Sequence, residues 1–293
     1  VIGVRTEREQ GDIYADCVVL ADGANALLGE RAGLRPQVKA EDMALAVKEV
    51  LFLPKETIEA RFNLAGSQGV VIEIAGNITH GMVGTGFLYT NKDSLAVGIG
   101  CMLSDMKKQS LTPYQLLEAM KQHPSIKPLI EGAEMKEYAA HLIPEGGYKA
   151  LPQLYGDGWL VVGDSAGFVN AVHREGSNLA MTSGRLAAET LIELHGQKKT
   201  FTAQYLAQYK QRLDDSFVMD DLKKYEGVPD LLSHNPQILG MYPSFVSDAA
   251  REMLTVDGRP KREKQKQILR QLTQRRSVLG LLGDAFKFWR AFR

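Results

Sequence analysis

The pattern of apolar and polar positions along the chain predicts strands, turns and helices before any motif is considered. Residues 159–162 form an uninterrupted apolar run, which is typical of a strand buried on both faces. Gly163 and Asp164 follow directly, and a glycine there lets the chain turn and leaves the carboxylate at the carboxyl end of the strand. Gly176 then opens a stretch with helical spacing over residues 178–194. The order of strand, tight turn and helix is the architecture of a dinucleotide cradle.

A second unit of the same kind lies near the start of the chain. Apolar residues 17–21 run into Asp22-Gly23, and a short apolar helix is expected over residues 26–32. One Asp-Gly or Gly-Asp pair is commonly only a strand-ending turn, but two that bracket a separate block of sequence form a pattern. A carboxylate there can accept a sugar hydroxyl, and a helix N-terminus can face a pyrophosphate or the pyrimidine side of a flavin. FAD offers all of these groups.

The block between the two units predicts an antiparallel sheet, because short apolar stretches follow one another with short turns. These stretches cover residues 44–50, 69–74, 81–89 and 94–103. A helix is expected to begin at Pro113 with Thr112 as its cap, and to stop before Pro124. Residues 138–143 then predict a strand that returns to the first part of the chain.

Beyond His195 the chain is expected to be helical and more charged. Residues 201–215 carry a stripe at helical spacing that most simply faces the core. Residues 257–266 predict a turn and a basic helix start, normally a solvated face, with docking of a partner as the sharper alternative. Residues 277–293 are too short and too charged to span a bilayer, and suit either a helix docked on its own protein or one lying on a membrane.

The amino-acid composition limits the number of domains, the kinds of partner and the redox compartment that we expect. The 293 residues are 44% hydrophobic and 24% charged with a formal net charge of zero, which suffices for one large or two modest domains. A balanced charge gives no general attraction to nucleic acid, so nucleic acid is excluded as a partner. Cys17 and Cys101 lie far apart in strand-like runs, so we interpret them as small buried residues rather than a disulfide. They fit a reducing compartment and predict a cytoplasmic protein.

One ordered series of residues resembles a known family. It runs from residues 143–154 (Ile-Pro-Glu-Gly-Gly-Tyr-Lys-Ala-Leu-Pro-Gln-Leu) through Gly163-Asp164 to residues 178–184 (Asn-Leu-Ala-Met-Thr-Ser-Gly). In this series the chain resembles the family of FixC and electron-transfer flavoprotein:quinone oxidoreductase, within the hydroxylase-like FAD superfamily. The resemblance implies an α/β and α+β fold with an incomplete Rossmann-like domain, an antiparallel-sheet substrate domain and a helical carboxyl end.

The resemblance also implies roles for particular residues. We predict that FAD is held by residues at the two turns and at the start of the long helix, namely Asp22, Gly23, Gly163, Asp164, Gly167, Gly176, Ser177 and Asn178. In quinone-reducing relatives a glycine pair lies by the quinone headgroup, where a bare backbone allows close approach. The resemblance assigns Gly146 and Gly147 to that quinone or substrate side, although composition alone favours a plain turn. No catalytic side chain is required, since the flavin carries the chemistry, and no metal site is expected.

The chain departs from the family pattern at both ends. It opens with residues 1–4 and 13–17 as the arms of a hairpin that turns through 7–11, where the family has a strand, a Gly-x-Gly-x-x-Gly turn and a helix. We therefore expect a carboxyl-terminal portion of a longer flavoprotein. Two cysteines cannot supply the four thiolates of the iron–sulfur domain in mitochondrial-type relatives, which favours the FixC branch with its separate ferredoxin-like protein, FixX.

The predicted domains follow from these elements. They are residues 1–36 and 144–196 for the two parts of the FAD-binding domain, 37–143 for the sheet domain and 197–293 for the helical carboxyl-terminal region. In the first domain, His173-Arg174-Glu175 invites a proton-transfer role beside a flavin, but turn closure and helix capping are favoured about two to one.

The resemblance implies an FAD-dependent oxidoreductase, linked to nitrogen fixation through FixC. It would pass electrons from an electron-transfer flavoprotein to quinone or to a ferredoxin-like partner, with peripheral contact to the inner membrane face through its last helix. One alternative is a flavoenzyme of the geranylgeranyl-reductase or monooxygenase type. The other, from a different class, is an inert carboxyl-terminal fragment or binding module.

Overall fold

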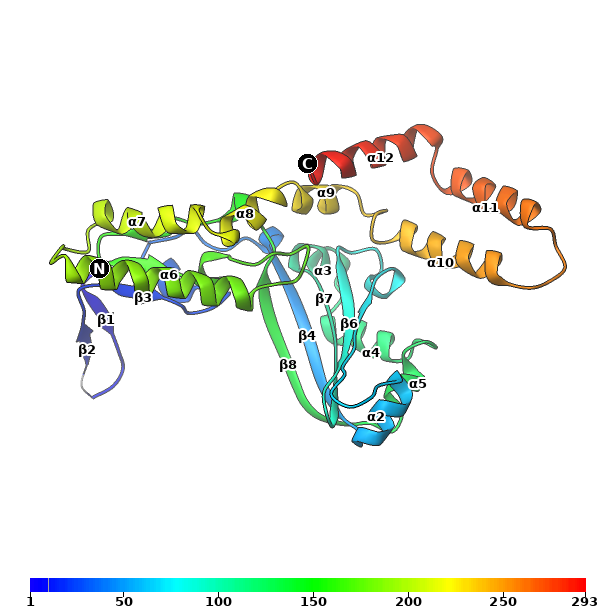
Figure 1. Cartoon of the computed structure of the whole chain (residues 1–293), viewed down its shortest axis with the longest axis horizontal. Coiled ribbons are helices and arrows are strands. Elements are labelled where there is room, and N and C mark those ends of the chain that lie inside the picture. Colours follow the sequence, from blue (N-terminus) through cyan, green and yellow to red (C-terminus); the bar gives the residue numbers. More distant parts are fainter. Residues whose placement is uncertain (10) are drawn as a thin grey trace. The chain divides into compact units, whose positions relative to one another are not determined.

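The computed structural model describes residues 1–9 and 11–293, and its contacts divide them into two compact units (Figure 1). Unit 1 comprises Val1–Met43, Leu142–Pro229 and Ala291–Arg293. Unit 2 comprises Ala44–His141 and Asp230–Arg290. Each unit is therefore assembled from segments that lie far apart in the sequence.

The central sheet of unit 1 has three strands in the order β3-β10-β9. They are β3 (Val18–Leu20), β9 (Tyr155–Gly156) and β10 (Trp159–Val161). Strand β10 is buried along its whole length, as its continuous apolar run predicts. It pairs in parallel with β3, in the register Val18 to Trp159 and Leu20 to Val161. The parallel pairing of two strands so far apart in sequence positions the candidate site.

Unit 1 also contains several helical segments, and the longest of them supply much of its apolar core. They are α1 (Leu27–Arg31), η1 (Ala40–Asp42), η3 (Tyr148–Ala150), η4 (Gly163–Ala166), α6 (Ser177–Gly196), α7 (Ala203–Asp214) and α8 (Phe217–Lys224). Helices α6 and α7 lie side by side (Figure 1). The predicted core stripe of α7 is confirmed: Tyr209 and Leu213 are fully buried, and Phe201 and Tyr205 pack against the same cluster. The Tyr209 hydroxyl donates to the carbonyl oxygen of Val161 at 2.8 Å, which satisfies a buried polar group.

The predicted hairpin at the start of the chain is confirmed. Strands β1 (Gly3–Arg5) and β2 (Asp12–Tyr14) pair antiparallel. The predicted turn over residues 7–11 includes position 10, which lies outside the described residues.

Unit 2 contains a five-stranded sheet in the order β5-β6-β7-β4-β8. Its strands are β4 (Met43–Phe52), β5 (Val71–Ile74), β6 (Gly84–Thr90), β7 (Ser94–Met102) and β8 (Glu134–Pro144). Strands β5, β6, β7 and β4 pair antiparallel in succession, which confirms the predicted antiparallel sheet. Strand β8 lies at one edge and exposes its first eight residues, several of them charged, as is common for edge strands.

Alternation along β7 separates the two faces of this sheet. Leu95, Val97, Ile99 and Cys101 are fully buried in one apolar cluster. The cluster is covered by helical segments, namely α2 (Lys55–Phe62), η2 (Asn77–Thr79), α3 (Leu103–Gln109), α4 (Pro113–Lys121) and α5 (Lys127–Ile130). The predicted cap of α4 is confirmed, because Thr112 and Gln115 form a reciprocal capping box. Both cysteines of the chain are free, as predicted, but only Cys101 is buried, whereas Cys17 is half-buried.

Four helices follow in the last part of the chain: α9 (Val228–His234), α10 (Met241–Leu254), α11 (Lys261–Arg275) and α12 (Val278–Ala291). The expectation that residues 257–266 form a solvated basic face is wrong at Lys264, whose side chain is completely buried. Its ammonium pairs with Asp257 at 2.8 Å and donates to the carbonyl oxygen of Thr255 at 2.6 Å. In the described part of the chain, every helix is too short or too polar to cross a membrane.

Candidate functional site

The parallel pairing of β3 with β10 brings the two predicted turns to one edge of the sheet. Asp22-Gly23 follows the carboxyl end of β3, and Gly163-Asp164 follows that of β10. The amide of Val162 donates to the carbonyl oxygen of Leu20 at 3.0 Å, so the pairing continues to the start of the turns. In open sheets with parallel strands, ligands bind at this edge.

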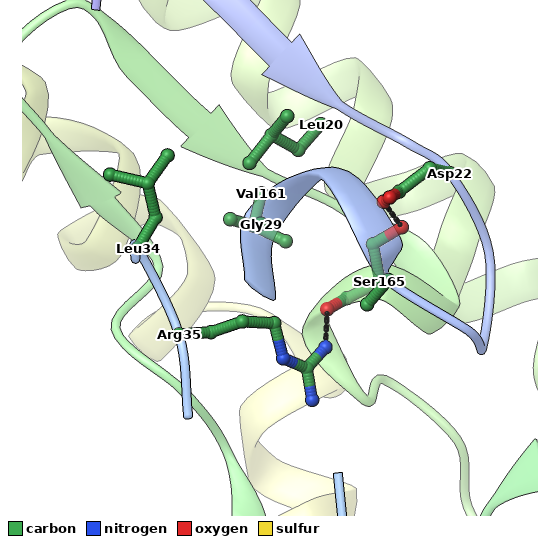
Figure 2. A pocket seen from close by; sticks show the side chains of 8 residues that line it. Leu20, Asp22, Gly29, Leu34, Arg35, Val161 and Ser165 are labelled. Carbon is green, nitrogen blue, oxygen red and sulfur yellow. Dashed lines mark hydrogen bonds between the residues drawn. The ribbon is translucent and has the colours of Figure 1, made fainter. Parts of the chain in front are cut away.

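Asp22 accepts hydrogen bonds on both carboxylate oxygens, and Figure 2 shows the one from Ser165. The Ser165 hydroxyl donates to Oδ1 at 2.8 Å, and the amide of Leu28 donates to Oδ2 at 2.8 Å. Asp22 therefore joins the turn after β10 to the first turn of α1. A carboxylate has about four acceptor positions, so these contacts leave room for a further donor. The predicted cofactor role of Asp22 stays a prediction beside this positioning role.

Arg35 completes the same cluster. Its Nη1 donates to the carbonyl oxygen of Ser165 at 2.5 Å (Figure 2), while Nε is buried without a hydrogen-bond partner among the described residues. Burial lowers the pKa of Arg35, and the nearby Asp22 and Glu30 partly oppose that effect. Asp22, Arg35 and Ser165 line a small pocket together with apolar residues such as Leu20 and Val161 (Figure 2). The cluster thus supports the two turns.

Gly163 allows α6 to approach the end of β10 closely. Its backbone has a φ of +57°, and a Cβ atom there would lie 3.1 Å from the Cβ of Ala180. Its amide donates to the Ser183 hydroxyl at 3.0 Å. Gly167, with a φ of +77°, ends η4 in the left-handed conformation. Both glycines are explained by backbone geometry that a side chain would strain.

The start of α6 lies beside the second turn. Gly176 is the N-cap, and a Cβ atom built on it would lie 3.8 Å from Oδ1 of Asp164. Asn178, in the first turn, donates to Glu175 at 2.8 Å. Ser177 and Asn178 are exposed at a helix end whose first amides have no partners within the helix. A carboxylate thus lies next to a helix N-terminus, a combination that suits a ligand with sugar hydroxyls and an anionic group.

The predicted quinone-side glycines lie in the loop that follows β8. A Cβ atom on Gly146 would lie 2.4 Å from the Cβ of Ala150 and 2.9 Å from Oδ1 of Asp42. Gly147 has a φ of +63°, a conformation that side chains rarely adopt. Packing and backbone conformation therefore account for both glycines, and their quinone role stays a prediction.

Glu145 precedes these glycines, and its pKa is raised above the ordinary value of a glutamate. Its amide donates to the carbonyl oxygen of Asp42 at 2.8 Å. Burial raises the pKa of Glu145 from 4.5 to about 7, while the positive charge of Arg174 acts in the opposite direction. Burial also raises the pKa of the neighbouring Asp42. Sequence analysis did not single out Glu145, because nothing in the local pattern distinguishes a half-buried glutamate from an exposed one.

His173 lies in the loop before α6. The amides of Asn170 and Glu175 each donate to the other residue's carbonyl oxygen, at 2.8 and 3.2 Å, and this pair closes the loop. The His173 Nε2 lies 2.8 Å from the Tyr225 hydroxyl. No side chain caps α6 at its N-cap. Turn closure is therefore provided by the loop backbone, and His173 contacts α8's end instead of the helix start.

Two family models match separate segments of the chain, one with the five-stranded sheet and one with the last four helices. The model "ETF-QO, ubiquinone-binding" matches residues 44–143, which contain the five-stranded sheet, and the model "ETF-QO/FixC family C-terminal domain" matches residues 228–293, which contain α9–α12. Protein FixC of Azorhizobium caulinodans is 58% identical over all of this chain, which covers 68% of that protein. The chain belongs to the FixC and electron-transfer flavoprotein:quinone oxidoreductase family.

Other relatives agree with this membership. Protein FixC of Azotobacter vinelandii is 57% identical, over 99% of this chain and 67% of its own length. The probable electron transfer flavoprotein-quinone oxidoreductase YdiS of Escherichia coli is 41% identical, over 94% of this chain and 64% of its own length. The family is one of electron-transfer oxidoreductases and flavoproteins, as the resemblance implied.

Solved structures confirm the fold class. A geranylgeranyl bacteriochlorophyll reductase-like protein from Thermoplasma acidophilum superposes with a TM-score of 0.64 at 17% identity, over 79% of this chain and 54% of that one. The flavin-dependent brominase Bmp2 superposes with a TM-score of 0.55 at 15% identity, over 82% of this chain and 57% of that one. At these identities the likeness concerns the fold, that of FAD-dependent flavoproteins.

Proposed function

We propose that this chain holds FAD at the edge where β3 and β10 end, and that it passes electrons from an electron-transfer flavoprotein to quinone. The juxtaposition of Asp164 with the start of α6 carries the proposal, since it offers an acceptor for sugar hydroxyls beside a positive helix end. Gly176 has no side chain to obstruct the approach. Bound FAD would supply the redox chemistry, and the residues of this chain would orient it and limit its contact with water.

The test of FAD binding uses the chain extended at its amino end to the length of the FixC relatives. Asp164→Ala should weaken FAD binding about 10- to 100-fold, because a hydrogen bond to a charged group contributes about 1.5–3 kcal/mol. Asp16→Ala, which removes an exposed carboxylate before β3, is the matched control. Flavin content after gel filtration and FAD affinity by fluorescence are the measurements. Unchanged FAD affinity in Asp164→Ala would contradict the proposed site.

The acceptor is proposed to be quinone, which the matched ubiquinone-binding model supports. That model ends at residue 143, so it covers the sheet domain and stops before Gly146-Gly147. Gly147→Val tests the predicted quinone side: quinone reduction should fall while reduction of the flavin by its protein donor survives. Gly132→Val is the matched control, because Gly132 is an exposed glycine with a φ of +74° and therefore suffers the same backbone strain. Wild-type quinone reduction in Gly147→Val would place the quinone within residues 44–143 instead.

A small ferredoxin-like protein of the FixX type is the proposed alternative acceptor. Electron transfer to it needs a complementary surface rather than a catalytic side chain, so the two acceptors separate experimentally. A Gly147→Val protein that loses quinone reduction but still reduces the ferredoxin-like protein would have two distinct exits for electrons. Loss of both would instead locate the defect at the flavin.

Contact with a membrane surface is proposed for α12. Leu279, Leu282, Phe286 and Trp289 follow one another at helical spacing and are 81%, 64%, 60% and 54% exposed. Asp284, on the opposite side of the helix, is buried, and Lys287, Arg290 and Arg293 add positive charge. An exposed apolar stripe with basic residues beside it suits the surface of an anionic bilayer.

Sedimentation with vesicles that contain anionic lipid tests this contact. Leu282→Glu should reduce vesicle binding without lowering the melting temperature, because the side chain is exposed. Val256→Glu, which makes the same change at an exposed apolar position outside the stripe, should bind as the wild type does. Equal vesicle binding by Leu282→Glu and the wild type would remove the membrane from the proposal.

A further inference from the structure

The loop from Asn170 to Glu175 is a closed and strained segment immediately before α6. Besides the two backbone hydrogen bonds that join its ends, the Asn170 side-chain oxygen accepts from the amides of Val172 and His173, each at 3.2 Å. Arg174 has a φ of +55°, which costs free energy for a residue with a side chain. Such a conformation persists only where surrounding contacts stabilise it, so we looked for residues outside the loop that contact it.

Tyr225, which follows α8 as its C-cap residue, contacts the loop from outside. Its hydroxyl lies 2.8 Å from Nε2 of His173, and the two rings meet edge to face with centroids 5.1 Å apart. The Lys224 ammonium also lies over the ring of Tyr225, 5.2 Å from its centroid. Tyr225 thus contacts both the loop and its own neighbour in the chain.

Tyr225 is in turn contacted by the last residues of the chain, which belong to unit 1. The rings of Tyr225 and Phe292 meet edge to face, with centroids 5.9 Å apart and an interplanar angle of 73°. Gly227 permits this close approach, because a Cβ atom there would lie 3.2 Å from the Cα of Ala291. Phe292, Tyr225 and His173 thus form a continuous aromatic contact from the chain's end to the loop before α6.

We propose that Tyr225 and Phe292 are positioning residues for the flavin: they hold His173, and through it the loop and the start of α6, in the conformation that receives the cofactor. The inference rests on the proposed function, which places FAD at the start of α6. A loop that is already ordered before FAD binds costs no ordering free energy on binding. The free energy of its contacts with FAD then contributes fully to the affinity. By linkage, bound FAD must stabilise the chain's end to the same extent.

Measurement of FAD affinity in the chain extended to the length of its relatives tests the first half. Phe292→Ala should weaken FAD binding about two- to tenfold, the range for an aromatic pair. Phe292→Tyr retains the ring and should restore the affinity. Tyr225→Phe keeps the edge-to-face contact with Phe292 but removes the hydroxyl that meets His173, and should also weaken FAD binding about two- to tenfold. Tyr114→Ala, which removes an exposed ring from the edge-to-face pair of Tyr114 and Tyr138 elsewhere in the chain, is the control and should bind FAD normally.

Two further readouts separate positioning from general stability. FAD should slow tryptic cleavage after Arg290 in the wild type and lose that effect in Tyr225→Phe. The midpoint potential of the bound flavin should shift in Tyr225→Phe. This variant differs from the wild type by a single hydroxyl group and should fold normally. If Asp164→Ala loses FAD while Phe292→Ala and Tyr225→Phe keep wild-type affinity, potential and cleavage protection, the inference fails and the proposed function stands. If Asp164→Ala also keeps its FAD, the proposed function fails.

Discussion

The five-stranded sheet of unit 2 and the helices α10–α12, which belong to the same unit almost entirely, are stabilised in different ways. The sheet buries a continuous apolar cluster in which Leu88, Leu95 and Ile99 have no exposed surface. Helices α10–α12, all of whose residues the structure describes, bury only Phe245, Lys264 and Asp284, two of which are charged. The sheet is stabilised by buried apolar surface, and the helices by two sets of polar contacts, centred on Lys264 and on Asp284, which we call clasps.

The two clasps tie neighbouring helices together. The Lys264 ammonium of α11 donates to the carbonyl oxygens of Glu252 and Thr255, at the end of α10. Asp284 of α12 accepts from Tyr242 at 2.7 Å and from Arg276 at 2.7 and 3.0 Å. Because charged groups hold these helices, their apolar side chains do not have to face inward. This difference explains how the last helices can be ordered and still present an apolar stripe.

The largest expected effect lies in the sheet. Leu88→Ala should lower the free energy of unfolding by about 2–5 kcal/mol, through lost burial and the cavity left behind. Leu279→Ala, in the exposed stripe of α12, should change it by less than about 0.5 kcal/mol. Denaturant unfolding followed by circular dichroism measures both. Equal losses of unfolding free energy in the two variants would mean that the apolar stripe of α12 is buried in the protein, as the core of the sheet is.

The Lys264 clasp should come next. Lys264→Met keeps the apolar stem but leaves two carbonyl oxygens and a carboxylate without their donor, so we expect a loss of about 1–3 kcal/mol. Lys266→Met, an exposed position on the same helix, is the matched control and should be close to neutral. Unfolding curves for the two variants are the measurement. A neutral Lys264→Met would show that apolar packing alone holds α10 and α11.

The Asp284 clasp predicts sensitivity to acid. Burial raises the pKa of Asp284, but hydrogen bonds from Arg276, Tyr242 and Gln237 outweigh it and hold the pKa below the ordinary 3.8. The folded state therefore binds this proton more weakly than the unfolded state, and the stabilisation is lost as the pH falls below about 3.8. Asp284→Asn should be less stable at neutral pH and should lose less stability in acid. Melting temperatures between pH 3 and 6 test this, and parallel curves for variant and wild type would contradict it.

Glu145 in unit 1 should show the opposite sign. Its pKa is raised from 4.5 to about 7, so the folded state binds the proton more tightly, and stability should decline as the pH rises from 4.5 to 7. Glu145→Gln removes the charge and should flatten that decline. Glu137→Gln, an exposed glutamate of β8, should leave it unchanged. Thermal melts across this range decide the matter, and a decline of wild-type size in Glu145→Gln would assign it to another group.

Local signals in the sequence were sufficient for many elements. Thr112 and Pro113 predicted the start of α4, because a capping residue and an N1 proline act within one turn. The short apolar stretch over residues 94–103, bounded by turns, predicted β7 for a similar reason, since such a stretch is a local signal. The site turns were found in the same way, from a strand that runs into an Asp-Gly or Gly-Asp pair.

Contacts between distant segments were beyond the sequence. Ser165 binds Asp22 across 143 residues, and His173 meets Tyr225 across 52. Lys264 was predicted to be solvated because it stands in a basic run, yet a carboxylate and two carbonyl oxygens surround it. A charge pattern describes one helix, whereas burial depends on what packs against it.

The sequence by itself determined the strands and the two strand-ending turns, because periodicity, glycine and proline conformations and helix capping act over a few residues. The tertiary structure alone decided that β3 pairs with β10, which is what brings Asp22 and Asp164 to one edge. It also decided that a lysine is buried and that the chain's end contacts Tyr225. Those outcomes depend on desolvation and on packing between segments far apart in the chain, which no local pattern specifies.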